Sequence, residues 1–287
     1  MTSHTTMWHE IADLPHTLEY VQVGAWHTRV LTIGAGEQTI VLMNGTSGHI
    51  EAWTHNLRAL AAEYRVIGYD YPGHGYSTLT DTDLEIADYE AHLIELLDAL
   101  GLDRVHLMGE SLGGWIAIKF ASHHPQRLHS VVLSAPGGRM IGALTMNKVS
   151  PISQKAVDNP TFENVKARLQ VVIHDPAKIS DELVEVRRSI YARPGFATSM
   201  RHITALQVPE IRARNQVTDE DYAAIPVPTL LVWTDHEPTG GATVGEHLAS
   251  LIPDGELVTI TNAAHWPQWE SPAEFNARAL DFLRRRG

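Results

Sequence analysis

Short apolar runs alternate with amphipathic stretches through the first half of the chain. Bounded by polar or glycine residues, such runs are typical of buried parallel strands, and we expect strands at 27–33, 39–43, 65–69, 105–108 and 131–134. Between two of them, Ile94, Leu97 and Leu100 recur at helical spacing before Gly101, a common stop residue. This alternation predicts an α/β fold with a mainly parallel central sheet and helices on both faces.

The alternation is lost between about 136 and 224, where charged, helix-forming segments such as 181–191 are separated by proline and glycine. Strand patterns return at 228–234 and 257–260, and an amphipathic helix is expected at 272–285. The sequence therefore predicts a core domain formed by 1–135 and 225–287, with 136–224 inserted as a helical cap. Five apolar cap residues are expected to pack inside the cap, with lining of the pocket as the alternative: Ile141, Leu144, Met146, Val171 and Ile173.

Charge and composition exclude several classes of function. Among the 287 residues, 34 are acidic and 22 basic, and the resulting formal charge of -12 disfavours nucleic acid as a partner. The chain has no cysteine, which excludes disulfides, thiolate metal sites and a cysteine nucleophile. No zinc-binding, phosphate-binding or dinucleotide-binding motif is present, so neither a metal nor a cofactor is expected. Residues 1–13 contain no continuous apolar stretch, so no membrane association and a cytoplasmic location are expected; a homo-oligomer is compatible with the sequence.

The segment from Gly109 to Gly113 has the pattern G-x-S-x-G between a predicted strand and a predicted helix. Glycine is needed on both sides of Ser111 because the turn leaves no room for side chains, and the strained turn lifts the serine hydroxyl clear of the sheet. The helix that follows places backbone N–H groups where negative charge develops. The pattern therefore predicts Ser111 as a nucleophile.

A serine nucleophile needs a base and an acid later in the chain. His265 follows the predicted strand 257–260 in a loop, which favours it as the general base. The strand ending at Thr234 leads directly into Asp235 and Glu237, and either carboxylate could hold the imidazole in its productive tautomer. The residues alone leave both acids open.

Stabilising the oxyanion requires two backbone donors. The residue after the nucleophile supplies one N–H, here that of Leu112. The loop Asn44-Gly45-Thr46-Ser47-Gly48 follows an early strand, and we expect the N–H of Thr46 to supply the other.

Taken together, these motifs resemble those of the α/β-hydrolases along essentially the whole chain. Within that family the chain is most similar to the meta-cleavage product hydrolases, which cut a carbon–carbon bond in vinylogous 1,5-diketones formed by extradiol ring opening. The segments that carry the resemblance are Asn44-Gly45-Thr46, Asp70-Tyr71-Pro72-Gly73-His74-Gly75, the Ser111 turn, Glu185-Val186-Arg187, Arg193-Pro194-Gly195 and His265-Trp266-Pro267-Gln268-Trp269-Glu270.

The resemblance implies roles for further residues. Arg187 would bind the substrate carboxylate through a bidentate guanidinium contact, and Gly45, Glu110 and Trp266 would also contact the substrate. The subgroup usually has Asn where this chain has Glu110, His where it has Asn44, and Asp where it has Glu237. Because Glu237 falls at the family acid position, the resemblance favours it over Asp235.

These features predict a serine hydrolase that takes a small apolar carbonyl substrate, and the resemblance implies cleavage of 2-hydroxy-6-oxo-2,4-dienoates from aromatic degradation. A carboxylate at Glu110 would repel an anionic substrate, so a carboxylesterase or lactonase acting on small apolar esters is the main alternative. A non-catalytic ligand-binding scaffold is a further alternative, because fold does not fix function.

Overall fold

The computed structural model describes residues 6–139 and 143–286, with the backbone alone for 143–150. Eight strands form one sheet in the order β1-β2-β4-β3-β5-β6-β7-β8. Their bounds are β1 His16–Val23, β2 Trp26–Ile33, β3 Thr39–Met43, β4 Arg65–Tyr69, β5 Val105–Glu110, β6 Leu128–Ser134, β7 Thr229–Thr234 and β8 Gly255–Ile260. Within the sheet, β2 runs antiparallel to its neighbours β1 and β4, and the pairs from β4 to β8 are parallel.

The parallel pairing brings the ends of several strands to one edge of the sheet. Met43 lies opposite Gly109, Glu110 opposite Ser134, and Thr234 opposite Ile260. The loops after β3, β5, β7 and β8 therefore start beside one another. This edge is where a parallel sheet usually carries its ligand site.

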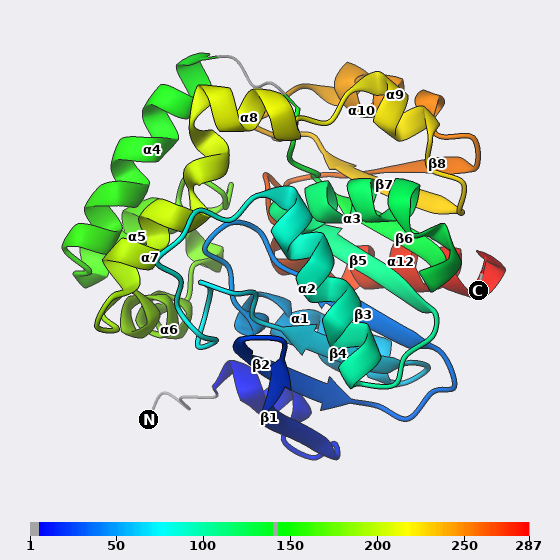
Figure 1. Ribbon diagram of the computed structural model, residues 1–287, viewed down its shortest axis with the longest axis horizontal. Helices are drawn as coiled ribbons and strands as arrows, with labels where there is room; N and C mark the ends of the chain where they lie inside the picture. Colours follow the sequence, from blue (N-terminus) through cyan, green and yellow to red (C-terminus); the bar gives the residue numbers. More distant parts are fainter. Residues whose placement is uncertain (1–5, 140–142, 287) are drawn as a thin grey trace.

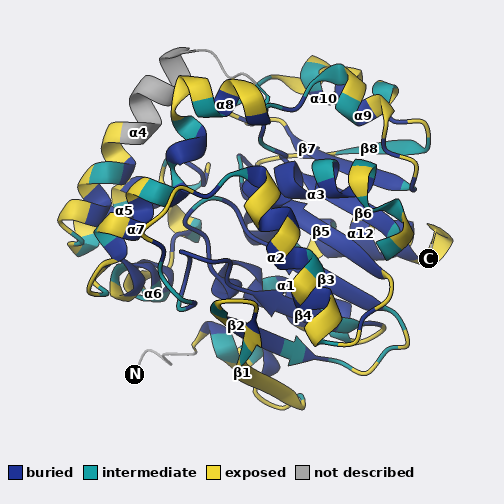
Figure 2. Cartoon of the chain, viewed as in Figure 1, coloured by how far each residue is buried: buried dark blue, intermediate teal, exposed yellow. Residues whose placement is uncertain are grey.

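Helices cover both faces of the sheet (Figure 1). On one face lie α2 (Ile86–Ala99), α3 (Leu112–His123), α9 (Asp219–Ala223) and α10 (Ala242–Leu251), and on the other lie α1 (Thr54–Ala61), α11 (Pro267–Glu270) and α12 (Pro272–Arg286). Short 3-10 helices occur at Met7–Ile11, Ile50–Trp53, Pro125–Arg127, Pro176–Lys178 and Ala205–Gln207. The central strands β3 to β7 are buried between the two layers, whereas the edge strands β1 and β8 are largely exposed or half-buried, as Figure 2 shows. The predicted α/β class, with its mainly parallel sheet, is confirmed.

Between β6 and β7 the chain forms helices instead of continuing the alternation. They are α4 (Ala143–Asp158), α5 (Phe162–Leu169), α6 (Asp181–Tyr191), α7 (Phe196–Ile203), α8 (Pro209–Asn215) and α9, and Figure 1 shows α4 to α7 gathered at one side of the sheet. Helix α6 has the bounds expected from the sequence, with Ser180 accepting a hydrogen bond from the Leu183 N–H at its start. The division into a core and a cap at 136–224 stays a prediction.

The sequence pattern missed strand β1. Its first five residues are exposed, because β1 is an edge strand that pairs with β2 alone. Leu18 and Tyr20 are 47% and 57% exposed, so the strand lacks the continuous buried run that identified the others. The strands predicted at 105–108 and 131–134 extend further in the structure, to Glu110 and back to Leu128.

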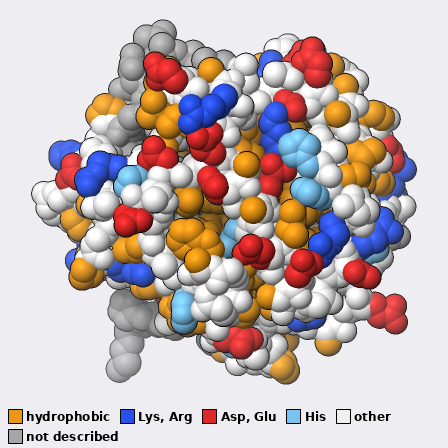
Figure 3. Space-filling view, in the orientation of Figure 1, with side chains coloured by type: hydrophobic (Ala, Val, Ile, Leu, Met, Phe, Trp, Pro, Cys, Tyr) orange, Lys and Arg blue, Asp and Glu red, His pale blue; other side chains and the backbone are white. Residues whose placement is uncertain are grey.

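Acidic and basic side chains are interspersed over the face of the molecule seen in Figure 3. That face therefore offers no continuous basic surface, in keeping with the net charge of -12. Within the described residues, no helix is both long and apolar enough to cross a membrane.

Candidate active site

Ser111 occupies a strained turn between β5 and α3. Its φ of 52° and ψ of -110° lie outside the regions that residues with side chains normally adopt. A Cβ added at Gly109 would lie 2.4 Å from the Gly113 carbonyl oxygen, and one at Gly113 would lie 2.5 Å from that of Met43. Both glycines are therefore required by close backbone approach, as expected for this motif.

Three side chains from three strand ends form a continuous chain of contacts. His265 Nε2 lies 2.9 Å from Ser111 Oγ, and His265 Nδ1 lies 3.0 Å from both carboxylate oxygens of Glu237. Ser111 follows β5, Glu237 follows β7 and His265 follows β8. This is the geometry in which an imidazole can take a proton from serine while a carboxylate fixes its tautomer.

Asp235, the other acid considered, lies elsewhere. Its carboxylate accepts hydrogen bonds from the backbone N–H groups of Asn262 and Ala263, at 3.0 and 3.4 Å. Glu237 is instead buried, and its Oε1 accepts hydrogen bonds from the N–H and hydroxyl of Thr239 at 3.1 and 2.7 Å. Asp235 thus stabilises the loop that precedes His265, whereas Glu237 contacts the imidazole.

The charges around His265 favour its protonated form. Burial lowers the pKa of His265, but the carboxylates of Glu237 and Glu110 outweigh burial and raise this pKa to about 9. The pKa of Glu237 is lowered, because the effect of His265 exceeds the opposing effect of burial. The imidazole therefore has to lose a proton before it can act as a base.

Glu110 points into the same site from the residue before Ser111. It is 1% exposed, and its Oε1 lies 3.6 Å from His265 Nε2. Burial raises the pKa of Glu110 to about 7, against the lowering effects of His265, the Gly45 N–H and Arg187. A Cβ at Gly45 would lie 2.5 Å from Glu110 Oε2, so a side chain at position 45 would displace this carboxyl group.

The loop after β3 is held firmly beside the Ser111 turn. The Asn44 carbonyl accepts hydrogen bonds from the Gly113 N–H and the Tyr71 hydroxyl, both at 2.9 Å, and the Asn44 side chain donates to the Tyr69 carbonyl at 3.1 Å. Thr46 lines the pocket.

Leu112 directly follows Ser111 and is the first residue of α3. As the first residue of that helix it has an N–H with no acceptor within the helix. The two expected oxyanion donors, the N–H groups of Thr46 and Leu112, therefore lie on segments that meet at Ser111. Their role stays a prediction.

A pocket of about 700 Å³, including space open to solvent, extends from these residues beneath the helices that follow β6. Its lining residues are Gly45, Thr46, Glu110, Ser111, Arg168, Val171, Val172, Arg187, Gln207, Pro238, Thr239, His265 and Trp266. All four residues expected to contact substrate are among them. Val171 was expected inside the cap but lines the pocket, whereas Ile173 is buried. Ile141 and the side chains of Leu144 and Met146 lie outside the described residues.

Two arginines enter this pocket with unsatisfied nitrogen atoms. Arg187, on α6, is 1% exposed and lies over the rings of Trp266 and Tyr191, at 5.2 and 5.9 Å. Among the described residues, its Nε and Nη2 have no hydrogen-bond partner, and neither do Nε and Nη1 of Arg168 on α5. A buried cation without a partner is costly, so both guanidinium groups favour an anionic ligand.

Sequence reasoning missed Arg168, although a signal was present. Val165, Arg168 and Leu169 are the buried residues of α5 and share one face at the spacing i, i+3, i+4. An arginine on the apolar face of a cap helix indicates either a buried ion pair or a ligand. The described residues provide no ion pair for Arg168.

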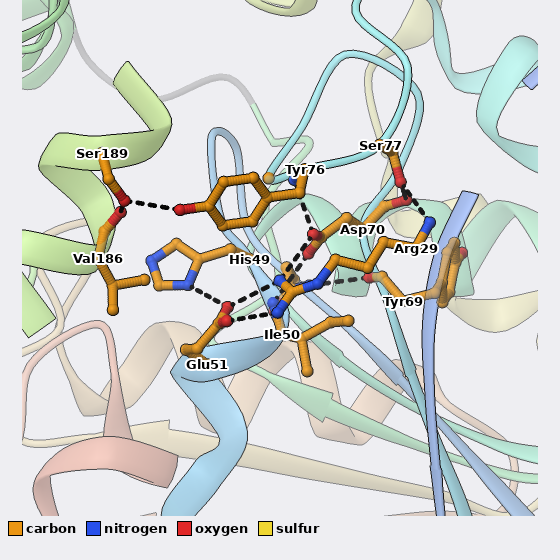
Figure 4. A network of polar contacts seen from close by, with 12 residues as sticks. Arg29, His49, Ile50, Glu51, Tyr69, Asp70, Tyr76, Ser77, Val186 and Ser189 are labelled. Carbon is orange, nitrogen blue, oxygen red and sulfur yellow. Dashed lines mark hydrogen bonds and ion pairs between the residues drawn. The ribbon is translucent and has the colours of Figure 1, made fainter. Parts of the chain in front are cut away.

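A buried polar network links the core to the helix that carries Arg187 (Figure 4). Arg29 of β2 binds Glu51 at 2.7 Å and Asp70 at 3.3 Å. Asp70 accepts from the Tyr76 N–H at 2.9 Å, and the Tyr76 hydroxyl lies 2.6 Å from Ser189 Oγ on α6. The last contact, between Tyr76 and Ser189, is exposed, and it joins the loop after β4 to the helix that carries Arg187.

Replacing Arg29 with Met should destabilise the protein by about 3–5 kcal/mol, because Glu51 and Asp70 would be left buried without their cation. Chemical denaturation would measure the free energy of unfolding. Arg58→Met is the matched control: Arg58 pairs with Asp13 at the surface, so its loss should cost less than about 1 kcal/mol. Equal losses in the two variants would contradict the role of the network.

Comparisons with known proteins identify the family of the chain. A family model described as "alpha/beta hydrolase fold" matches residues 38–272. A 2-hydroxy-6-oxononadienedioate/2-hydroxy-6-oxononatrienedioate hydrolase of Paraburkholderia phymatum is 31% identical over 87% of this chain and 88% of its own. A 2-hydroxy-6-oxo-6-phenylhexa-2,4-dienoate hydrolase of Comamonas testosteroni is 31% identical over 88% of this chain and 90% of its own.

Among solved structures, a meta-cleavage product hydrolase from Pseudomonas fluorescens superimposes with a TM-score of 0.82, covering 94% of this chain and 98% of that one. Its sequence identity is 23%, so this likeness shows a shared fold alone. The family match includes the strands from β3 to β8 and the Ser111 turn. The chain therefore belongs to the α/β hydrolase fold family and is related to its meta-cleavage product hydrolases.

Proposed function

We propose that this protein is a serine hydrolase that cleaves a carbon–carbon bond in 2-hydroxy-6-oxo-2,4-dienoate substrates. The observation that carries the proposal is Arg187, a buried guanidinium group with unpaired nitrogens in the same pocket as Ser111 and His265. A carboxylate bound there would satisfy the cation through charge-assisted hydrogen bonds. The names of the two relatives point to dienoate substrates of this kind.

In this mechanism, the dienol first becomes its keto form as the proton of the 2-hydroxyl group moves to C5, with His265 as the group that carries it. His265 then deprotonates Ser111, whose Oγ attacks the C6 carbonyl carbon. The N–H groups of Leu112 and Thr46 stabilise the oxyanion. The C5–C6 bond breaks with its electrons delocalised into the α-keto acid portion, which takes up the proton that His265 removed from Ser111. The neutral imidazole then activates water, which releases the acyl group from Ser111 as a carboxylic acid.

Arg168 supports a substrate that carries a second negative charge. It is 8% exposed and lines the same pocket, and Nε and Nη1 of its guanidinium group lack partners among the described residues. A single substrate carboxylate bound to Arg187 would leave the buried guanidinium group of Arg168 without a partner. The dienedioate named for the Paraburkholderia phymatum relative has a carboxylate at each end, and we propose a substrate of that class.

A carboxylesterase or lactonase is the second candidate, and Glu110 is the observation that favours it. This carboxyl group is buried beside Ser111, where its ionised form would repel a substrate carboxylate. A neutral ester would meet no such repulsion. Both candidates require Ser111 to react with a fluorophosphonate probe, whereas a non-catalytic scaffold would leave it unlabelled.

Steady-state cleavage of 2-hydroxy-6-oxo-hexa-2,4-dienoates, beside hydrolysis of short 4-nitrophenyl esters, tests the two candidates directly. We expect Arg187→Met to lower kcat/KM for the dienoate by about 100-fold or more, as expected when one partner of a buried charge pair is removed. The neutral ester should lose far less. Arg188→Met is the matched control, because the side chain of the neighbouring Arg188 is 42% exposed and pairs with Glu185. Ester hydrolysis without any dienoate turnover in the unmodified enzyme would favour the esterase.

A further inference from the structure

Glu110 is a second carboxyl group facing the imidazole, and the contacts of Ser111, His265 and Glu237 do not require it. Its Oε1 lies 3.6 Å from His265 Nε2, the same nitrogen that lies 2.9 Å from Ser111 Oγ. Glu110 Oε1 is buried and has no hydrogen-bond partner among the described residues. The imidazole is therefore flanked by a carboxyl group on each side, with Glu237 at Nδ1 and Glu110 beyond Nε2.

Charged and polar groups interact with Glu110 from several surrounding elements, besides Ser134, which pairs with it on β6. They are the Gly45 N–H after β3, Tyr71 after β4, Arg168 on α5, Arg187 on α6, Glu237 after β7 and His265 after β8. Apart from His265, Arg187 is the cation that lowers the pKa of Glu110 most, more than Arg168 does. The raised pKa of His265, about 9, means that the free enzyme at neutral pH keeps a proton on the imidazole.

We propose that Glu110 accepts this proton when an anionic substrate binds, and that the transfer converts His265 into the base for Ser111. In this step the N–H bond at His265 Nε2 breaks and an O–H bond forms at Glu110 Oε1. The pair carries no net charge before or after the transfer. The inference rests on the proposed chemistry of Ser111 and His265, although not on which substrate bond is cleaved.

An exchange of partners at Arg187 drives the transfer. A substrate carboxylate that pairs with Arg187 removes the cation that stabilises the ionised form of Glu110, and it adds a negative charge nearby. Substrate also excludes water from the site, which further disfavours the carboxylate. Once protonated, Glu110 can donate a hydrogen bond instead of repelling the substrate. The neutral imidazole keeps its Nδ1 proton toward Glu237 and presents Nε2 to Ser111.

The test compares pH profiles of kcat/KM for two esters that differ in charge, neutral 4-nitrophenyl butyrate and anionic mono-4-nitrophenyl glutarate. For the neutral ester, the rate should rise with pH as His265 loses its proton, with an apparent pKa of about 9. For the anionic ester, the rising limb of the profile should lie at a pH lower by about one unit or more, because the proton has moved to Glu110. In Glu110→Gln the rising limbs for the two esters should coincide, because no carboxylate is left to accept the proton. Both should lie at lower pH than the limb of the neutral ester on the unmodified enzyme, because Glu110 no longer raises the pKa of His265.

Two results would overturn the proposal: coincident limbs in the unmodified enzyme, or a difference that persists in Glu110→Gln. The matched control is Glu246→Gln, which removes an exposed carboxylate on α10 and should preserve the difference. Dienoate cleavage, measured on the same preparations, tests the proposed function separately. Turnover of dienoate without a limb difference would contradict the proposed role of Glu110 and leave the proposed function standing. A limb difference without dienoate turnover would contradict carbon–carbon cleavage and leave the role of Glu110 standing.

A second measurement needs no turnover. Nitrogen-15 NMR of histidine-labelled protein at neutral pH should show His265 as an imidazolium in the free enzyme. Saturating glutarate should convert it to the neutral form with the proton on Nδ1, and the same addition to Glu110→Gln should not produce that conversion. The His265 signal is identified by its loss in His265→Gln. An imidazole that stays charged with glutarate bound would contradict the proposal.

Discussion

Ser111→Ala is expected to lower kcat by about 10⁵-fold or more on any substrate the enzyme turns over, because removing a nucleophile leaves only binding and oxyanion stabilisation. The same loss should appear with the dienoate and with the neutral ester, since both reactions begin at the same Oγ. Fluorophosphonate labelling should disappear in parallel. Steady-state rates and probe incorporation measure the two effects.

The fold should survive this substitution, which makes the result interpretable. The alanine side chain differs only by Oγ, which is hydrogen-bonded to His265, so the stability cost should be about 1 kcal/mol. Chemical denaturation of the variant checks this. Substantial turnover by a folded Ser111→Ala protein would contradict the assignment of the nucleophile.

Much of the fold follows from local pattern, because buried strands and amphipathic helices have distinct periods. The strands at Thr39–Met43 and Arg65–Tyr69 and the helix Asp181–Tyr191 have the bounds expected from the sequence. Strand β1 does not, because an exposed edge strand presents polar residues where burial would demand apolar ones. The short helix Pro267–Glu270 was also missed, since a single helical turn has no periodicity to detect.

The site was predictable where a motif fixes the backbone and less so where contacts come from distant segments. Ser111 and His265 follow strand ends, and the parallel sheet brings strand ends together. The contact between Glu110 and His265 is made by side chains alone, and the two residues lie 155 positions apart in the sequence. Arg168 required knowledge of which face of α5 is buried. The local sequence signals Arg168 only through its spacing with the apolar residues Val165 and Leu169, and it signals the Glu110 contact only through an unusual residue type beside the nucleophile.

Glu237 and Asp235 are expected to differ sharply when each is made neutral. Glu237→Gln should lower kcat by about 10³–10⁴-fold, because an amide can donate to His265 Nδ1 and so stabilise the tautomer that cannot accept the Ser111 proton. Asp235→Asn should change kcat by less than about 10-fold, since Asp235 binds the Asn262 and Ala263 backbone.

The pH dependence adds a second, independent signature for Glu237. The carboxylate of Glu237 is the main influence that raises the pKa of His265 to about 9. Removing that charge lowers this pKa, so the rising limb of the rate profile should move to lower pH even as the plateau falls. Asp235→Asn should leave the limb in place. If instead Asp235→Asn shifts the limb and Glu237→Gln does not, Asp235 is the acid that acts on His265, and the loop after β7 must rearrange during turnover to bring it there.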